Sequence, residues 1–127
     1  MFATIGFLVS LLLTVVALVL TLVSGKTGHR RAHLARAIIT VLLLGTTVVF
    51  ALLLGEVRQF PAREMGIHKI FSRTGVFLVP PIVLTGALLW RRPTWRTAHR
   101  VCVLLFLLAV LGAASTGLWV LWLSTAK

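Results

Sequence analysis

Long apolar runs separated by short polar segments dominate the sequence. Four runs cover residues 2–23, 34–54, 70–90 and 101–123. A helix needs about 20 apolar residues to cross a membrane, because each residue rises about 1.5 Å and the hydrocarbon core is about 30 Å thick. Every run meets that length, and the connections are too short to fold on their own. The pattern predicts an all-α integral membrane protein, an up-down four-helix transmembrane bundle that forms a single domain over residues 1–127.

Small residues recur on one face of the first predicted helix with almost unbroken three-and-four spacing. They are Ala3, Gly6, Ser10, Thr14, Ala17, Thr21 and Ser24. Comparable stripes follow His33 in the second run and His99 in the fourth. Small residues let membrane helices approach closely, and the same faces would leave room for a flat cofactor. The stripes are therefore open to two interpretations, helix packing alone or packing around a bound group.

Composition supports the membrane interpretation and changes the meaning of the charge. Hydrophobic residues make up 59% of the chain and charged residues 12%, and 13 Lys and Arg against two acids give a net charge of +11. In a soluble protein this excess would suggest nucleic acid, but no soluble region remains outside the apolar runs. We therefore expect no nucleic-acid partner, and we expect the basic face to contact anionic lipid head groups.

The basic residues also predict the orientation of the chain. They gather in the first and third connections, and cytoplasmic loops carry an excess of Lys and Arg. Those two connections should be cytoplasmic and both termini outside, in a multi-pass protein of a bacterial inner (plasma) membrane. The residues that carry this prediction are Lys26, Arg30, Arg31 and Arg36 in the first connection and Arg91, Arg92, Arg96 and Arg100 in the third.

Two histidines are placed where they could act together. His33 opens the second predicted helix and His99 opens the fourth; these helices run in the same direction, so both histidines should lie at the same depth. In an up-down bundle with short loops, helices 2 and 4 are diagonally opposed. A haem iron with two protein ligands takes one from each side, which makes His33 and His99 candidate ligands of a haem b iron. Arg36, Arg96 and Arg100 are candidates to pair with its propionates.

A different metal site is an alternative. His29 precedes His33 by four residues, and with His99 and Cys102 the two could bind copper or zinc if the connection were helical. Gly25 and Gly28 argue against a helix there. Cys102 is the only cysteine, which excludes an internal disulfide and favours a small buried side chain.

A possible second site lies at the other membrane face. His68 opens the third predicted helix, and no other histidine is available on its side. Glu56, at the end of the second predicted helix, could serve as a weak partner or accept the imidazole N–H. An interfacial histidine with no ligand role explains the same residues, so both interpretations stay open.

The helix-opening segments AHLARA, IHKIFSRTG and RPTWRTAHRV, with STGLWVLWL closing the chain's last helix, carry a family resemblance. Together, over residues 31–123, they resemble a family of small four-helix bacterial membrane proteins of unknown function, whose members often accompany haem-copper oxidases or their assembly genes. In that family a histidine opens helix 2, another closes it, a third opens helix 3, and a histidine and arginine precede helix 4. The matching residues here are His33, His68, and His99 with Arg100.

The chain departs from the family pattern at one position, and it also resembles a second, more distant family. Gly55 and Glu56 stand where the family has the histidine that closes helix 2, which affects the outer face and leaves the inner pair intact. Paired histidines on alternate helices of a four-helix core also resemble the cytochrome b561-like transmembrane haem proteins, here reduced to one complete pair.

Three functions fit these observations. The first is a b-type haem protein, or a small subunit of a respiratory or photosynthetic complex, that passes electrons to or from a quinone or a partner subunit. The second is an assembly factor that handles haem or copper for a terminal oxidase, and the third is a cofactor-free structural subunit bound to other integral membrane subunits. No catalytic nucleophile or general base can be assembled from the sequence, so we do not expect an enzyme.

Overall fold

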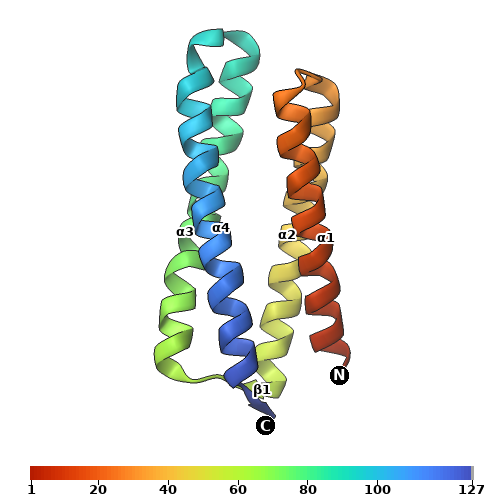
Figure 1. Ribbon diagram of the computed structural model, residues 1–127, viewed down its shortest axis with the longest axis vertical. Helices are drawn as coiled ribbons and strands as arrows, with labels where there is room; N and C mark the ends of the chain where they lie inside the picture. Colours follow the sequence, from red (N-terminus) through yellow and green to blue (C-terminus); the bar gives the residue numbers. More distant parts are fainter. Residues whose placement is uncertain (127) are drawn as a thin grey trace. The chain divides into compact units, whose positions relative to one another are not determined.

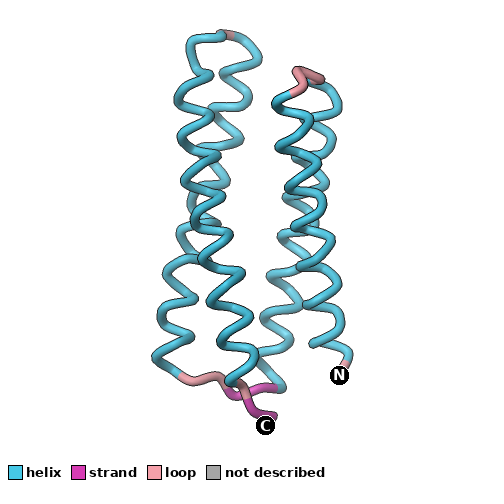
Figure 2. Tube along the Cα trace, in the orientation of Figure 1, coloured by secondary structure: helices cyan, strands magenta, loops and turns pink. Residues whose placement is uncertain are grey.

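The computed structural model describes residues 1–126, and most of these are helical (Figures 1 and 2). The helices are α1 (Phe2–Lys26), α2 (Arg30–Val57), α3 (Ala62–Arg91), the short 3-10 helix η1 (Pro93–Trp95) and α4 (Arg96–Leu123). Two strands of two residues each, β1 (Arg58–Gln59) and β2 (Thr125–Ala126), pair in a small sheet. Within the described residues, four helices are long and apolar enough to span a membrane. This confirms the predicted number of apolar helices and is the pattern of a multi-pass membrane protein.

The helices are longer than the apolar runs, mainly at their N-terminal ends. α2 begins at Arg30, α3 at Ala62 and α4 at Arg96, four to eight residues before the corresponding runs. Apolar length measures only the hydrocarbon core, whereas a helix can continue into the interface where charged side chains are solvated. Gly28 ends this continuation between α1 and α2, because its φ of 77° is a left-handed conformation that favours glycine.

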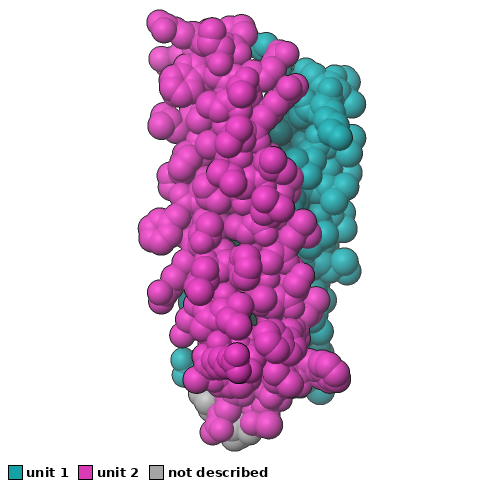
Figure 3. Space-filling view, turned by 60° about the vertical axis from the view of Figure 1, so that its left-hand side comes forward, with its two compact units in different colours: residues 1–58, 127 teal, residues 59–126 magenta. Residues whose placement is uncertain are grey.

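Contacts divide the described chain into two compact units, residues 1–58 and 59–126 (Figure 3). In the first unit α1 packs along α2, and in the second α3 packs along α4. A short connection joins the helices of each pair, so each pair is antiparallel (Figure 1). We refer to them as the first hairpin and the second hairpin.

Hydroxyl groups fill the interior of the first hairpin. The buried face of α1 consists of Ser10, Thr14, Ala17, Thr21 and Ser24, as the small-residue spacing predicts. Two of these residues meet a threonine of α2, with 3.0 Å between the hydroxyl oxygens of Thr14 and Thr47 and 2.9 Å between those of Thr21 and Thr40. Small polar side chains that bond across helices are a usual way for membrane helices to associate.

Aromatic rings lying on glycines complete the packing of both hairpins. The ring of Phe50 in α2 lies on Gly6 of α1 so closely that a Cβ there would overlap it, and Phe2 meets Phe50 edge to face with 5.9 Å between ring centroids. In the second hairpin Phe71 of α3 lies on Gly112 of α4 in the same way. A glycine on one helix thus receives a large ring from the other, and the two backbones can approach closely.

Candidate functional site

His33 is seated against α1, its own hairpin partner. The Nδ1–H of His33 donates to the carbonyl oxygen of Thr21 at 2.9 Å, and the ring lies on Gly25, where a Cβ would be 3.2 Å from Nδ1 and Cε1. A carbonyl oxygen can only accept, so Nδ1 carries the proton in this bond. In the neutral imidazole the lone pair is therefore on Nε2.

His99 has the same arrangement in the second hairpin. Its Nδ1 lies 3.1 Å from Oγ1 of Thr85, and its Cε1 would be 3.3 Å from a Cβ at Gly86. The Thr85 hydroxyl has one proton, and it donates that proton to the carbonyl of Pro81 at 2.7 Å. The contact with Pro81 is the shorter of the two, so we assign the hydroxyl proton to it, and Thr85 Oγ1 then accepts from Nδ1–H of His99.

His68 repeats the geometry at the opposite end of the second hairpin. Its Nδ1–H is shared between the carbonyl of Ala113 at 3.1 Å and Oγ1 of Thr116 at 3.2 Å. The Thr116 hydroxyl donates to the carbonyl of Gly112 at 2.6 Å, so its oxygen accepts from the histidine. A Cβ at Gly117 would lie 3.1 Å from Cε1 of His68.

These three contacts have the form that metal-ligating histidines usually show. Such a histidine donates one ring N–H to a carbonyl or another acceptor, which fixes the tautomer and the ring orientation and leaves the second nitrogen to bind the metal. His33, His68 and His99 all make the first of these interactions, each with the partner helix of its own hairpin. The residues present are thus chemically suited to axial ligation through Nε2.

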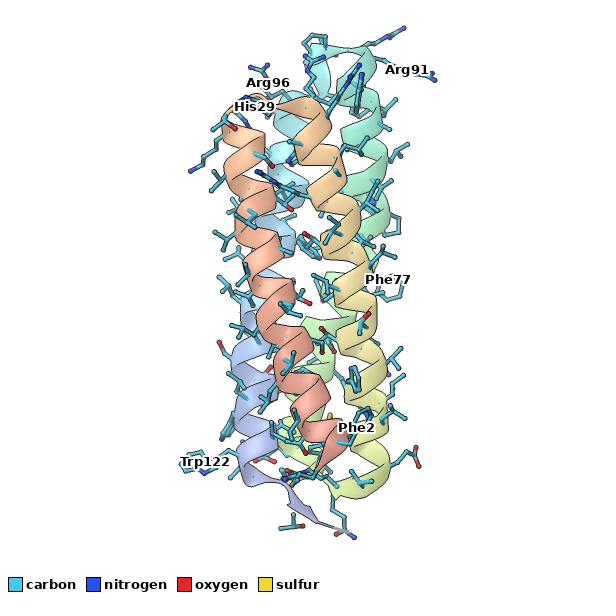
Figure 4. The ribbon with its side chains drawn as sticks, turned by 90° about the vertical axis from the view of Figure 1, so that its right-hand side faces the viewer. Phe2, His29, Phe77, Arg91, Arg96 and Trp122 are labelled. Atoms are coloured by element: carbon cyan, nitrogen blue, oxygen red, sulfur yellow. The ribbon has the colours of Figure 1, made fainter. Side chains whose placement is uncertain are left out.

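His29 is different and is exposed. It precedes the first residue of α2, and its Nδ1 lies 3.2 Å from Oγ1 of Thr27 in the same connection (Figure 4). The expectation that the glycines prevent a helix holds at Gly28, whereas Gly25 lies within α1. Because α2 begins after His29, one continuous helix does not carry both His29 and His33.

A conventional metal cage does not form in the part of the chain that the structure describes. Within residues 1–126, no three side chains of His, Cys, Asp or Glu come together to hold an ion. Cys102 is a free thiol of α4 and is only partly buried, not fully buried as expected. A two-ligand haem site needs no such group of three, so this finding bears only on copper or zinc.

The candidate propionate partners lie one helical turn or less from the two histidines. Arg36 follows His33 by three residues and donates from one guanidinium nitrogen to the carbonyl of Leu20 at 3.3 Å. Arg96 and Arg100 flank His99 and are exposed; Arg96 lies beside the turn of the second hairpin (Figure 4). Arg36 has further N–H groups beyond that one bond, because a guanidinium carries five.

The predicted pairs each join one hairpin to the other. His33 and Glu56 belong to the first hairpin, whereas His99 and His68 belong to the second. The pairing of His33 with His99, and that of His68 with Glu56, stay predictions. What the structure adds is the contact of each histidine with the partner helix of its own hairpin. We call this contact the seat of the histidine: a glycine on which the ring lies and an oxygen that accepts its Nδ1–H.

The residues that form these seats could not be predicted from the sequence. Gly25, Gly86 and Gly117 receive the rings, and Thr85 and Thr116 accept hydrogen bonds from them. One signal was present in the sequence, because a Thr-Gly pair occurs near the end of α3 and again near the end of α4. It has no meaning until the histidine that faces each pair is known.

Comparison with known proteins gives no family assignment. No family model matches the chain, and no curated protein or solved structure shows significant similarity to it.

Proposed function

We propose that this chain is a b-type haem-binding membrane protein, or a small haem-binding subunit of an electron-transfer complex, with His33 and His99 as axial ligands. The observation that carries the proposal is the hydrogen bond that each of these histidines donates from Nδ1 to its own hairpin. This bond holds each ring in the tautomer that binds iron through Nε2. Bound haem would supply a one-electron centre that exchanges electrons with a quinone or with another integral membrane subunit.

Membrane topology supports the pairing of the two residues. If all four long helices cross the membrane, the turn of the first hairpin and the turn of the second hairpin lie on the same side. His33 is the fourth residue of α2 and His99 is the fourth residue of α4. In that topology both imidazoles lie near the same side of the membrane, as two ligands of one haem require.

The charges near the two histidines also fit a haem. Its propionates are anionic, and Arg36, Arg96 and Arg100 place guanidinium groups within a turn of the proposed ligands. Arg is suited to this role because its planar donor fork matches a carboxylate. The basic residues of both turns favour the cytoplasmic side for this end, where they would also contact anionic lipid head groups.

A cofactor-free structural subunit is the second candidate, and the polar contacts of the interior favour it. Within residues 1–126, no buried side-chain nitrogen or oxygen lacks a hydrogen-bond partner. The histidines already join the helices of each hairpin, and such bonds are worth about 0.6–2 kcal/mol in a membrane. In this function the same residues would hold the helices together with no bound group.

An absorption spectrum of the purified protein separates the two functions. We expect a Soret band and sharp visible bands on reduction in the wild type, and their loss in His33→Ala and in His99→Ala. The control is His29→Ala, which removes an exposed imidazole from the same turn and should leave the spectrum unchanged. A wild-type protein that is colourless after haem is added, yet folded by circular dichroism and monodisperse, would reject the haem proposal in favour of the structural one.

A further inference from the structure

The second hairpin holds two histidine seats built from the same parts. In one, His99 of α4 lies on Gly86 and bonds to Thr85 of α3; in the other, His68 of α3 lies on Gly117 and bonds to Thr116 of α4. Because the helices are antiparallel, a local two-fold rotation relates the two seats. Each consists of a Thr-Gly pair on one helix and a histidine on the other.

The distances agree as closely as the residue types. Nδ1 lies 3.1 Å from the threonine oxygen in one seat and 3.2 Å in the other, and Cε1 would lie 3.3 Å and 3.1 Å from a glycine Cβ. In both seats the threonine hydroxyl donates to the carbonyl four residues before it, at 2.7 Å and 2.6 Å. The same tautomer is therefore fixed in both histidines, by the same kind of bond.

We propose that His68 is the axial ligand of a second haem, and that the opposite axial position of its iron is open to a small diatomic ligand such as carbon monoxide. This rests on the proposed function, since it assigns to His68 the chemistry proposed for its twin, His99. The two seats cannot share one iron. His68 and Thr85 lie 17 residues apart on α3, which at about 1.5 Å per residue separates the seats by about 26 Å.

Glu56, the weak partner expected for His68, would not close this position to carbon monoxide as an imidazole does. The lack of a second imidazole follows from where the histidines lie along the chain. The chain has four: His29 and His33 lie at the turn of the first hairpin, and His99 starts α4 after the turn of the second. In a four-span topology these three lie on one side of the membrane. His68 lies near the start of α3, just after the connection between α2 and α3, which is on the other side. No second imidazole of this chain therefore reaches a haem bound to His68.

This arrangement gives the two haems different chemistry. An iron held by two histidines has both axial positions filled and does not bind carbon monoxide, whereas an iron held by one histidine retains a position for it. His68 would thus make this end of the second hairpin a site for binding a diatomic gas. The end near His33 and His99 would carry electrons only.

Haem stoichiometry and carbon monoxide binding test this inference. The protein, purified in detergent and saturated with haem, should contain two haems per chain and show a difference spectrum when carbon monoxide is added to the reduced form. In His68→Ala we expect one haem per chain and loss of that difference spectrum. His68→Gln should behave likewise. This variant serves if His68→Ala does not fold, because the glutamine amide can still donate to the carbonyl of Ala113.

Two further results fix the interpretation. Lys69→Ala, which changes an exposed residue next to His68, should leave both readouts unchanged. A haem content that does not fall in His68→Ala, or a His68-dependent haem that does not react with carbon monoxide, would overturn the inference. If His68→Ala removes a haem while His33→Ala and His99→Ala do not, the proposed His33–His99 site fails and the His68 site stands.

Discussion

The imidazole of His99 donates its Nδ1–H to Oγ1 of Thr85, and this bond of 3.1 Å joins the start of α4 to the last third of α3. It does so because the hydroxyl proton of Thr85 is already used on the carbonyl of Pro81. The direction of the hydrogen bond, and with it the nitrogen that could bind iron, is therefore set by the backbone of α3.

Replacing Thr85 by Val should weaken haem binding without removing a ligand. The substitution keeps the side-chain shape and removes the acceptor that orients His99, and the loss of such a partner typically reduces metal affinity about 10- to 100-fold. Titration of the haem-free variant with haem measures the change. Thr74→Val is the matched control, because Thr74 is exposed on the same helix and bonds only to the carbonyl of Ile70. Equal affinities for the wild type and Thr85→Val would show that this bond does not position the ligand.

Adding a methyl group at Gly25 should displace His33. The new Cβ would lie 3.2 Å from the imidazole, so the ring must move by a few tenths of an ångström, which strains its hydrogen bond to the carbonyl of Thr21. We expect Gly25→Ala to lower haem occupancy and to alter the spectrum of what remains. Gly45→Ala is the control, since no atom within 4 Å would meet its Cβ, and it should keep full occupancy. The seat assigned to His33 is wrong if both variants bind haem alike.

The hydroxyl pair of Thr14 and Thr47 should contribute measurably to the stability of the first hairpin. A double-mutant cycle with Thr14→Val and Thr47→Val is expected to give a coupling energy of about 0.6 kcal/mol, the average for polar bonds between membrane helices, because each hydroxyl can also donate to a carbonyl of its own helix. Reversible unfolding in mixed micelles measures it. Pairing Thr14→Val with Thr46→Val, an exposed neighbour whose hydroxyl bonds within α2, should give no coupling. A coupling of zero in both cycles would contradict a direct bond.

Cysteine labelling should report the two sides of the membrane. In a Cys102→Ala background, Thr27→Cys lies in the connection between α1 and α2, and Gln59→Cys lies between α2 and α3. The distribution of basic residues predicts that the first lies inside and the second outside. A membrane-impermeant maleimide added to intact cells should therefore label only Gln59→Cys, and both variants after lysis. The reverse pattern would show that the chain has the opposite orientation. Equal labelling of the two variants in intact cells would exclude a topology in which the two connections lie on opposite sides.

The helices could be predicted because each apolar run is long enough to cross a bilayer and holds at most one charged residue. The buried face of α1 was predicted as well, since the spacing of Ser10, Thr14, Ala17, Thr21 and Ser24 already follows the helical repeat. Helix starts were less accessible, because Arg30 and Arg96 begin helices outside the apolar runs, where hydropathy carries no signal.

The histidine seats could not be predicted for a different reason. Which residue of α1 or α3 faces a given histidine depends on how far one helix is rotated and shifted against its neighbour. Two residues, Thr27 and Gly28, and the capping His29 make the first turn, whereas Arg92 and the 3-10 helix Pro93–Trp95 make the second, so the offset differs between the hairpins. His33 accordingly faces a glycine eight residues earlier in the chain, and His99 one thirteen residues earlier.

The hydroxyl bonds inside the first hairpin bear on how the protein is made. Thr14 and Thr21 find their partners in Thr47 and Thr40, so these interhelical bonds are complete once α2 has been synthesised. The nascent chain can insert α1 and α2 as a closed pair while α3 is still in the ribosome. The placement of four threonines thus makes the polar contacts of the first hairpin independent of α3 and α4.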